Sequence, residues 1–91
     1  MSTINISRSH SMGTSDARSA VEKVADQLKQ KIGADYHWDD DTLRFKGGGA
    51  NGTIEVEPST VHVQIKLGML LSAMKGMVKS QAEGYLDEYL E

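Results

Sequence analysis

The sequence predicts an α+β fold of two layers, in which two helices cover one face of an antiparallel sheet. Apolar and polar residues alternate in five short stretches, as expected of strands with one buried face. In two longer stretches the apolar residues recur at helical spacing, and turn-forming residues separate the strands. The predicted order is β-α-β-β-β-β-α. By analogy of architecture alone, this resembles a reduced helix-grip fold, in which a sheet grips a long C-terminal helix.

Length and composition limit the classes of protein. The 91 residues predict one domain, 1–91, because a chain of this size has no room for a second core. A net charge of −3 predicts repulsion of nucleic acid and anionic membrane, and the absence of cysteine excludes disulfides and thiolate chemistry. The longest apolar run, Met69–Leu71, is far shorter than the ~18–20 residues of a transmembrane segment. With no signal-like N-terminus, a cytoplasmic protein is expected.

A strand and a helix are predicted in the first third of the chain. Ile4 and Ile6 alternate with polar residues in the strand, and Thr14 or Ser15 is expected to cap the helix. Gly33 suits a left-handed C-terminal cap, so that the helix ends near residues 31–32. The apolar face of this helix spans roughly 140°. It consists of Ala17, Ala20, Val21, Val24, Ala25, Leu28 and Ile32.

Four consecutive strands are predicted to follow as a meander. Turns are expected at the acidic run 39–41, the glycine-rich run 47–52 and the Pro-Ser pair 58–59. The apolar strand residues all fall on one face, so both helices must share that face. The core is expected to join Trp38, Leu43, Phe45, Ile54, Val63 and Ile65 to Val21, Val24, Leu28, Leu70, Met74 and Val78.

One final helix is predicted from Gly68 or Met69 to the end of the chain. Its core face spans about 120°. That face consists of Leu70, Leu71, Met74, Met77, Val78, Ala82, Tyr85 and Tyr89. Glycine in an exposed helix costs ~1 kcal/mol relative to alanine, yet small residues repeat every fourth position on the opposite side. We interpret these residues, with Met69 beside them, as a candidate interaction ridge that another surface could approach closely. The alternative is that they reflect sequence drift on a solvent-exposed face that tolerates small residues. The ridge consists of Gly68, Met69, Ser72, Gly76, Ser80 and Gly84.

No motif predicts chemistry. The run "KGGGANG" lacks the following helix and the Lys-Ser/Thr pair of a phosphate-binding loop. Of the widely spaced His10, His37 and His62, the last two are expected on the same side of the sheet, as part of a solvated face. Serines and carboxylates form no nucleophile motif. No catalytic, cofactor-binding or metal-binding residue is therefore predicted, and the chain is expected not to be an enzyme.

Four stretches carry a family resemblance. They are "SRSHSMGTSDAR", "YHWDDDTLRFKG", "NGTIEVE" and "VHVQIKLGMLLSAMKGMV", which together cover nearly the whole chain. In these stretches the sequence resembles the polyhydroxyalkanoic acid system protein family. Met12 stands where leucine is expected, and the acidic run 39–41 replaces a turn expected to contain glycine. The resemblance implies small bacterial proteins linked to polyester storage granules, and it supplies no catalytic residue.

Two functional hypotheses follow from the ridge and the resemblance. The first is an accessory or regulatory binding module of the polyhydroxyalkanoate system, which contacts the granule surface, a granule protein or a second copy of itself. The alternative is a carrier or sensor that holds a hydroxyacyl or fatty-acyl ligand between the sheet and the C-terminal helix. A continuous core favours the first hypothesis, and an enclosed apolar cavity favours the second.

Overall fold

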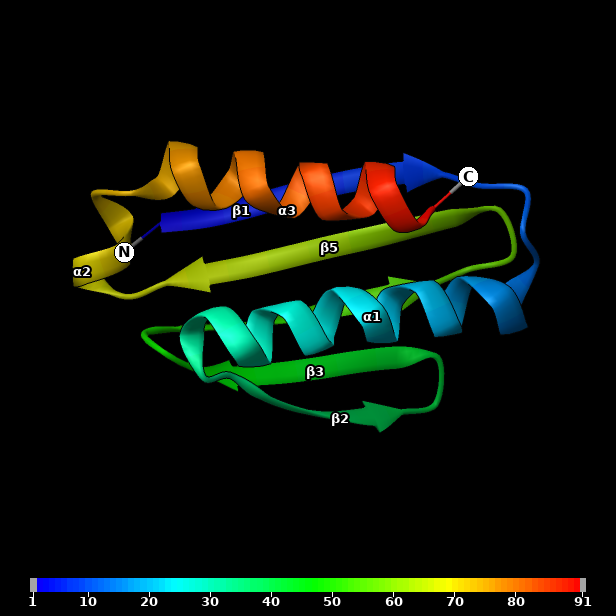
Figure 1. Cartoon of the computed structure of the whole chain (residues 1–91), viewed down its shortest axis with the longest axis horizontal. Helices are drawn as coiled ribbons and strands as arrows, with labels where there is room; N and C mark the ends of the chain where they lie inside the picture. Colours follow the sequence, from blue (N-terminus) through cyan, green and yellow to red (C-terminus); the bar gives the residue numbers. More distant parts are fainter. Residues whose placement is uncertain (1, 91) are drawn as a thin grey trace.

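The computed structural model describes residues 2–90, except for the side chains of Ser2, Ile32 and Leu70. The order of the elements is the predicted one, apart from a break in the C-terminal helix (Figure 1). The elements are β1 (Ser2–Ser9), α1 (Thr14–Ile32), β2 (Asp35–Asp39), β3 (Thr42–Gly47), β4 (Ala50–Val56), β5 (Thr60–Leu67), α2 (Met69–Ser72) and α3 (Lys75–Tyr89).

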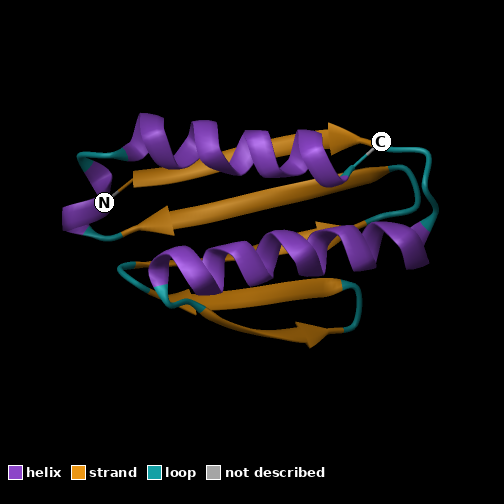
Figure 2. Cartoon of the chain, in the orientation of Figure 1, coloured by secondary structure: helices purple, strands orange, loops and turns teal. Residues whose placement is uncertain are grey.

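The five strands form one antiparallel sheet in the order β1-β5-β4-β3-β2. Both long helices lie on the same face of this sheet, which confirms the predicted two-layer architecture (Figure 2). Helix α3 lies over β1, and α1 lies over β3 and β4 (Figure 1). The register aligns Ile4 with Ile65 and Ile54 with Val63, so that apolar side chains meet on the helix-covered face.

The core is one continuous cluster between the two layers. All five strands contribute to it, although the two aromatic residues of β2, Tyr36 and Trp38, are only partly buried. Leu28 and Val78 also lie at its margin. The predicted core side chains of Ile32 and Leu70 lie outside the described part of the chain. The largest fully buried side chains are Ile4, Leu43, Ile54, Leu67, Leu86, Val21 and Val61.

The turn between β3 and β4 is shorter than the predicted run 47–52. Gly47 pairs with Ala50, and the two residues between them have positive φ angles of 62° and 84°, as in a tight two-residue hairpin. Gly52 lies inside β4, where an added Cβ would collide with the carbonyl oxygen of Gln64 and the ring of Phe45. Glycine at this position therefore permits close backbone approach within the strand.

The two ends of α1 differ in how well they were predicted. Gly33 adopts the expected left-handed conformation, and its N–H donates to the carbonyl of Lys29. The prediction of a Thr14 or Ser15 cap is wrong, because the N-cap is Gly13 and it makes no side-chain capping bond. Thr14 already belongs to the helix, whereas Gly13 has the φ of 82° that the entry from β1 requires.

The prediction of one unbroken C-terminal helix is also wrong. The chain leaves the α-helix after Ser72, and a turn closed by a bond from the Met74 N–H to the Leu71 carbonyl precedes α3. A helical wheel assumes a constant 100° per residue, so the break changes which face of the later residues is buried. Met74 and Met77, predicted in the core, are exposed. Leu86, which the prediction missed, is fully buried beside the predicted Ala82.

The observed phase of α3 can be tested by a pair of truncations. Leu86→Ala should lower the free energy of unfolding by ~2–5 kcal/mol, because it opens a cavity under α3. Met77→Ala removes a side chain of similar size from an exposed site, and should change it by less than ~0.5 kcal/mol. Urea denaturation of both variants measures the difference. Equal losses would show that α3 is rotated relative to the structure.

Candidate functional site: a methionine elbow

The break in the C-terminal helix forms an elbow at one end of the molecule (Figure 1). We use the name elbow for residues 69–77, which comprise α2, the turn and the start of α3. The elbow is held against the β3–β4 turn by two contacts. The Gly68 N–H donates to the Gly49 carbonyl at 2.8 Å, and the Leu71 side chain lies against Gly49.

Three methionines make the elbow the apolar part of the surface. Met69 is 85% exposed, Met74 43% and Met77 55%, and they are the exposed large apolar side chains among those that the structure describes. Scattered exposed apolar residues are ordinary, but here they all fall within one short segment. Methionine is flexible and polarizable, so its side chain adapts to irregular apolar surfaces.

The candidate ridge is divided by the elbow. Gly68 is half-buried, and an added Cβ would lie 3.1 Å from the Gly49 oxygen. Ser72 is also half-buried, and its hydroxyl donates to the Gly68 carbonyl at 2.9 Å. On α3 the ridge is exposed: Gly76, Ser80 and Gly84 face solvent, and a Cβ at either glycine would meet no atom within 4 Å. The freely accessible part of the ridge therefore consists of Met69 and the residues on α3.

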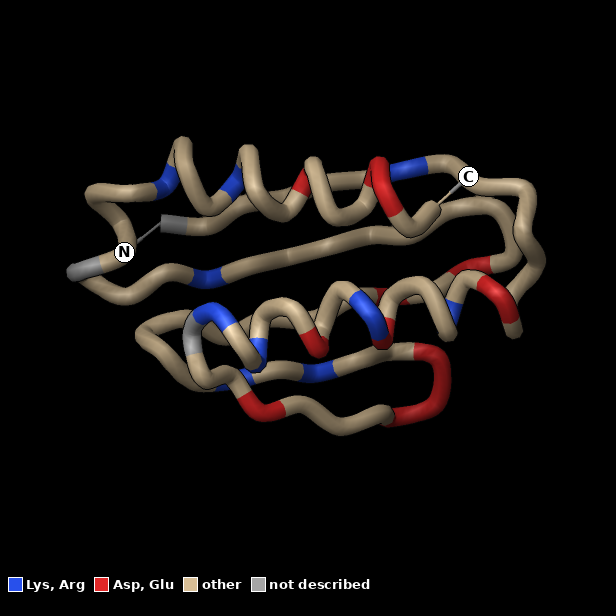
Figure 3. The backbone as a smooth tube through the Cα atoms, in the orientation of Figure 1, with Lys and Arg blue, Asp and Glu red and all other residues tan. Residues whose placement is uncertain are grey.

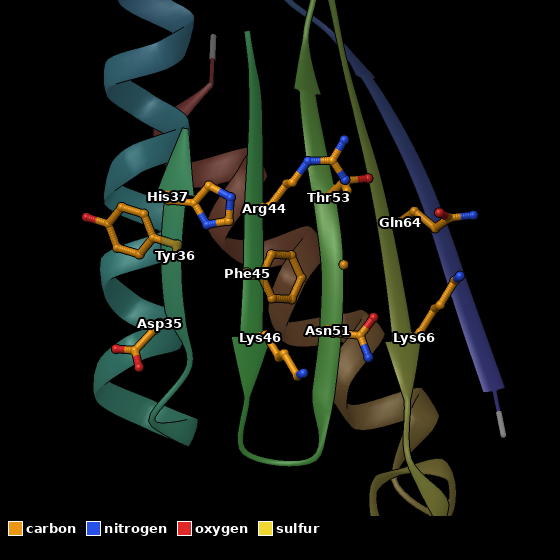
Figure 4. A pocket seen from close by; sticks show the side chains of 11 residues that line it. Asp35, Tyr36, His37, Arg44, Phe45, Lys46, Asn51, Thr53, Gln64 and Lys66 are labelled. Carbon is orange, nitrogen blue, oxygen red and sulfur yellow. The ribbon is translucent and has the colours of Figure 1, made fainter. Parts of the chain in front are cut away.

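The sheet face opposite the helices holds a shallow depression of about 770 Å³ (Figure 4). Lys46, Asn51 and Lys66 stand in register across three strands at one side of it. Arg44, Thr53 and Gln64 form the neighbouring row. Ammonium and amide groups in this arrangement can donate hydrogen bonds to an oxyanion. Because the face is open to water, such contacts are weakened by solvent.

Two histidines lie on this open face, as predicted, but in different environments. His37 is exposed beside Arg44. His62 Nδ1 lies 2.8 Å from the Ser7 hydroxyl, and its Nε2 lies 3.5 Å from a carboxylate oxygen of Glu57. Sequence reasoning missed this grouping, because its members come from separate strands and a turn. They are the residue types of a hydrolase triad, but here Nδ1 faces the serine, whereas in a triad that nitrogen faces the carboxylate.

His10 has a structural role. It is buried, and its ring accepts a hydrogen bond from the Met12 N–H at Nδ1 and donates one from Nε2 to the Glu57 carbonyl. The backbone N–H of His10 donates to the Ser59 carbonyl. These bonds fix the β1–α1 connection against the β4–β5 turn. Among residues 2–90, no cluster of three or more His, Asp or Glu is arranged to hold a metal ion.

Hydrogen bonds and ion pairs join each of the two long helices to an edge strand of the sheet. Arg8 of β1 donates to Glu83 at 2.9 Å and to Asp87 at 3.2 Å, and these hydrogen bonds raise the pKa of its guanidinium. At the other edge, the Tyr36 hydroxyl donates to Asp26 at 2.6 Å. That hydrogen bond, followed by burial, raises the pKa of Tyr36 to about 12. The elbow is therefore at the start of a helix whose far half is fixed by Arg8.

One family model matches residues 4–90; its description is "Putative polyhydroxyalkanoic acid system protein". The chain belongs to this family. The match covers all four stretches that carry the resemblance. His10 lies in the first of these stretches, and the elbow lies in the last. A comparison with curated proteins finds no match. None of the helices within residues 2–90 is long and apolar enough to cross a membrane.

The raised pKa of Tyr36 predicts a loss of stability at high pH. Asp26 accepts its bond from the neutral phenol, whose usual pKa is ~10. The contribution should be complete below pH ~10 and should disappear as the pH rises through ~12, because the ionised form has lost the proton it donates. Tyr36→Phe should therefore be less stable than the parent at pH ~9, and the difference should vanish near pH ~12. A constant difference, measured by thermal unfolding, would contradict this.

Proposed function

We propose that this chain is an accessory binding module of the polyhydroxyalkanoate system, which attaches to the apolar surface of a granule, or of a protein on it, through the elbow. The observation that carries the proposal is the gathering of the exposed methionines Met69, Met74 and Met77 at one end of the molecule. Their burial against a partner would remove apolar area from water, which is the main driving force of association. Membership of the family supports the granule system as the setting.

The arrangement of the core favours a binding module over a carrier. The space between the sheet and the two helices is occupied by one continuous cluster, to which β1, β5 and α3 all contribute. A carrier of an acyl chain would need an apolar cavity at that place. The depression on the open sheet face is open to solvent, has mostly polar or charged residues around it and lies on the other side of the sheet. A module that works by surface contact needs no such interior space.

Changing the methionines tests the proposal. The triple variant Met69→Gln, Met74→Gln, Met77→Gln keeps the side-chain length and removes the apolar ends, so we expect at least ~10-fold weaker cosedimentation with purified polyester granules. The matched control replaces the same residues with leucine and should bind as the parent does. Both variants should melt near the parent temperature, since the sites are exposed. Unchanged binding by a folded glutamine variant would refute the role of the elbow.

Substitutions at the two glycines of α3 distinguish a contact at the elbow from a contact along the whole ridge. Gly76→Leu places a large side chain in open space beside Met77, so the domain should remain folded while granule binding or self-association is lost. Gly84→Leu is the matched control, two turns further along the same helix. Loss of binding in both variants would indicate contact along the whole exposed ridge, and loss in Gly76→Leu alone would confine it to the elbow. Full binding by both variants would show that the glycines are solvent-facing positions with no role in the contact.

A further inference from the structure

Positive charge gathers at the end of the molecule that carries the elbow (Figure 3). Several elements end or begin there: the last turn of α1, the end of β3, the end of β5 and the first turns of α3 (Figure 1). These ends are held together, because the Gly68 N–H donates a hydrogen bond to the Gly49 carbonyl and Gly47 of β3 lies close to the backbone of Gly33 and Ala34, just after α1. The lysines on these segments are Lys29, Lys31, Lys46, Lys66, Lys75 and Lys79.

These lysines differ from the arginines, because within residues 2–90 none of them forms an ion pair with a carboxylate. The arginines are paired: Arg8 with Glu83 and Asp87, Arg18 with Asp41 at 3.8 Å, and Arg44 with Asp39 at 3.3 Å. None of the ion pairs within residues 2–90 includes a lysine of the elbow end. Their charge is therefore available to an external anionic partner.

The acidic residues lie mainly toward the opposite end. They include the β2–β3 turn at 39–41, the end of β4 and the last turns of α3, as the red segments of Figure 3 show. Asp35, at the start of β2, is an acidic residue of the elbow end and lies opposite Lys46 in the sheet register. The long axis measures 36 Å, whereas the Debye length is ~8 Å at physiological salt. An anionic surface at the elbow end would be screened from the distant acidic groups. The net charge of −3, which suggested repulsion of anionic membranes, therefore does not describe this end of the molecule.

We propose that the elbow end binds a negatively charged amphiphilic surface, such as a lipid layer with acidic headgroups. The inference rests on the proposed function for the use of the elbow as the contact, and it adds the chemistry of the target. Met69, Met74 and Met77 enter the apolar layer, while the surrounding lysines remain at the level of the headgroups. Apolar side chains surrounded by lysines are the usual means of interfacial attachment.

The positions of the lysines also set the orientation. Lys75 and Lys79 lie on α3, on the helix-covered side of the sheet, whereas Lys46 and Lys66 project from its open face (Figure 4). Lys29 and Lys31 are on the last turn of α1. Because basic groups flank the elbow on both faces of the sheet, the molecule stands with its long axis directed away from the surface.

Vesicle binding tests the inference. The intact chain is mixed with vesicles of phosphatidylcholine and phosphatidylglycerol, or of phosphatidylcholine alone, and the bound fraction is measured by cosedimentation. Binding should need the anionic lipid. A lysine near such a surface contributes about fivefold in affinity, so Lys75→Glu with Lys79→Glu should weaken binding more than ~20-fold. High salt should have a similar effect, because screening shortens from ~10 Å at 0.1 M to ~3 Å at 1 M.

The control is Lys23→Glu, which makes the same kind of charge change in the middle of α1. Its ammonium lies 6.0 Å from the Tyr89 ring, at the outer limit of a cation–π contact, so the variant should fold and bind vesicles as the parent does. Acidic residues in the first turns of α3 also suit the helix dipole, so the double variant should remain folded. A melting curve checks both variants.

The outcomes separate this inference from the proposed function. Equal binding to neutral and anionic vesicles, or an unaffected Lys75→Glu, Lys79→Glu variant, would overturn the charge-based inference. Binding to granules without binding to anionic vesicles would overturn it too, while leaving the proposed function intact. Binding to anionic vesicles but not to granules would support the inference and refute the granule setting.

Discussion

The contact between the elbow and the β3–β4 turn determines the form of the C-terminal third of the chain. Strand β5 ends beside this turn, and the Gly68 N–H and the Leu71 side chain both meet Gly49 there. A helix continuing straight from this contact would lose its approach to β1. The turn after Ser72 reorients the chain, so that Ala82 and Leu86 enter the core and Arg8 reaches Glu83 and Asp87. The exposure of Met74 and Met77, which a continuous helix would have turned toward the core, accompanies this change of direction.

Sequence reasoning predicted those features that depend on neighbours along the chain. The alternation around Ile4 and around Val63 identified the strands and their buried faces, and Gly33 identified the end of α1 through a backbone conformation that glycine adopts readily. The phase of α3 could not be obtained in this way. It depends on the break, and the residues just before the break contact Gly49, which is distant in sequence and becomes a neighbour only when the hairpin has formed. Met74, Met77 and Leu86 were therefore placed wrongly or missed.

The candidate site shows the same limit. The small residues Gly76 and Gly84 were correctly predicted to face away from the core, because both belong to a single regular helix. Gly68 and Ser72 were grouped with them only because the helix was taken as continuous. The net charge of the sequence could not reveal the distribution of charge, since Lys31, Lys46 and Lys66 come to the same end of the molecule only when the helix and strand ends meet. Net charge sums these groups with acidic residues at the far end of a 36 Å molecule.

The exposed elbow also has a cost for so small a domain. Burying one methionine side chain fully is worth ~1.5–3 kcal/mol, and total stability is typically ~5–15 kcal/mol. Gly76 and Gly84 add ~1 kcal/mol each relative to alanine, although an alanine Cβ would meet no atom at either position. These five residues, the three methionines and the two glycines, do not serve the stability of the isolated fold. Residues that break local rules without improving the packing are expected where a surface has a task outside the domain, and here all of them except Gly84 lie in the elbow that the proposed contact uses.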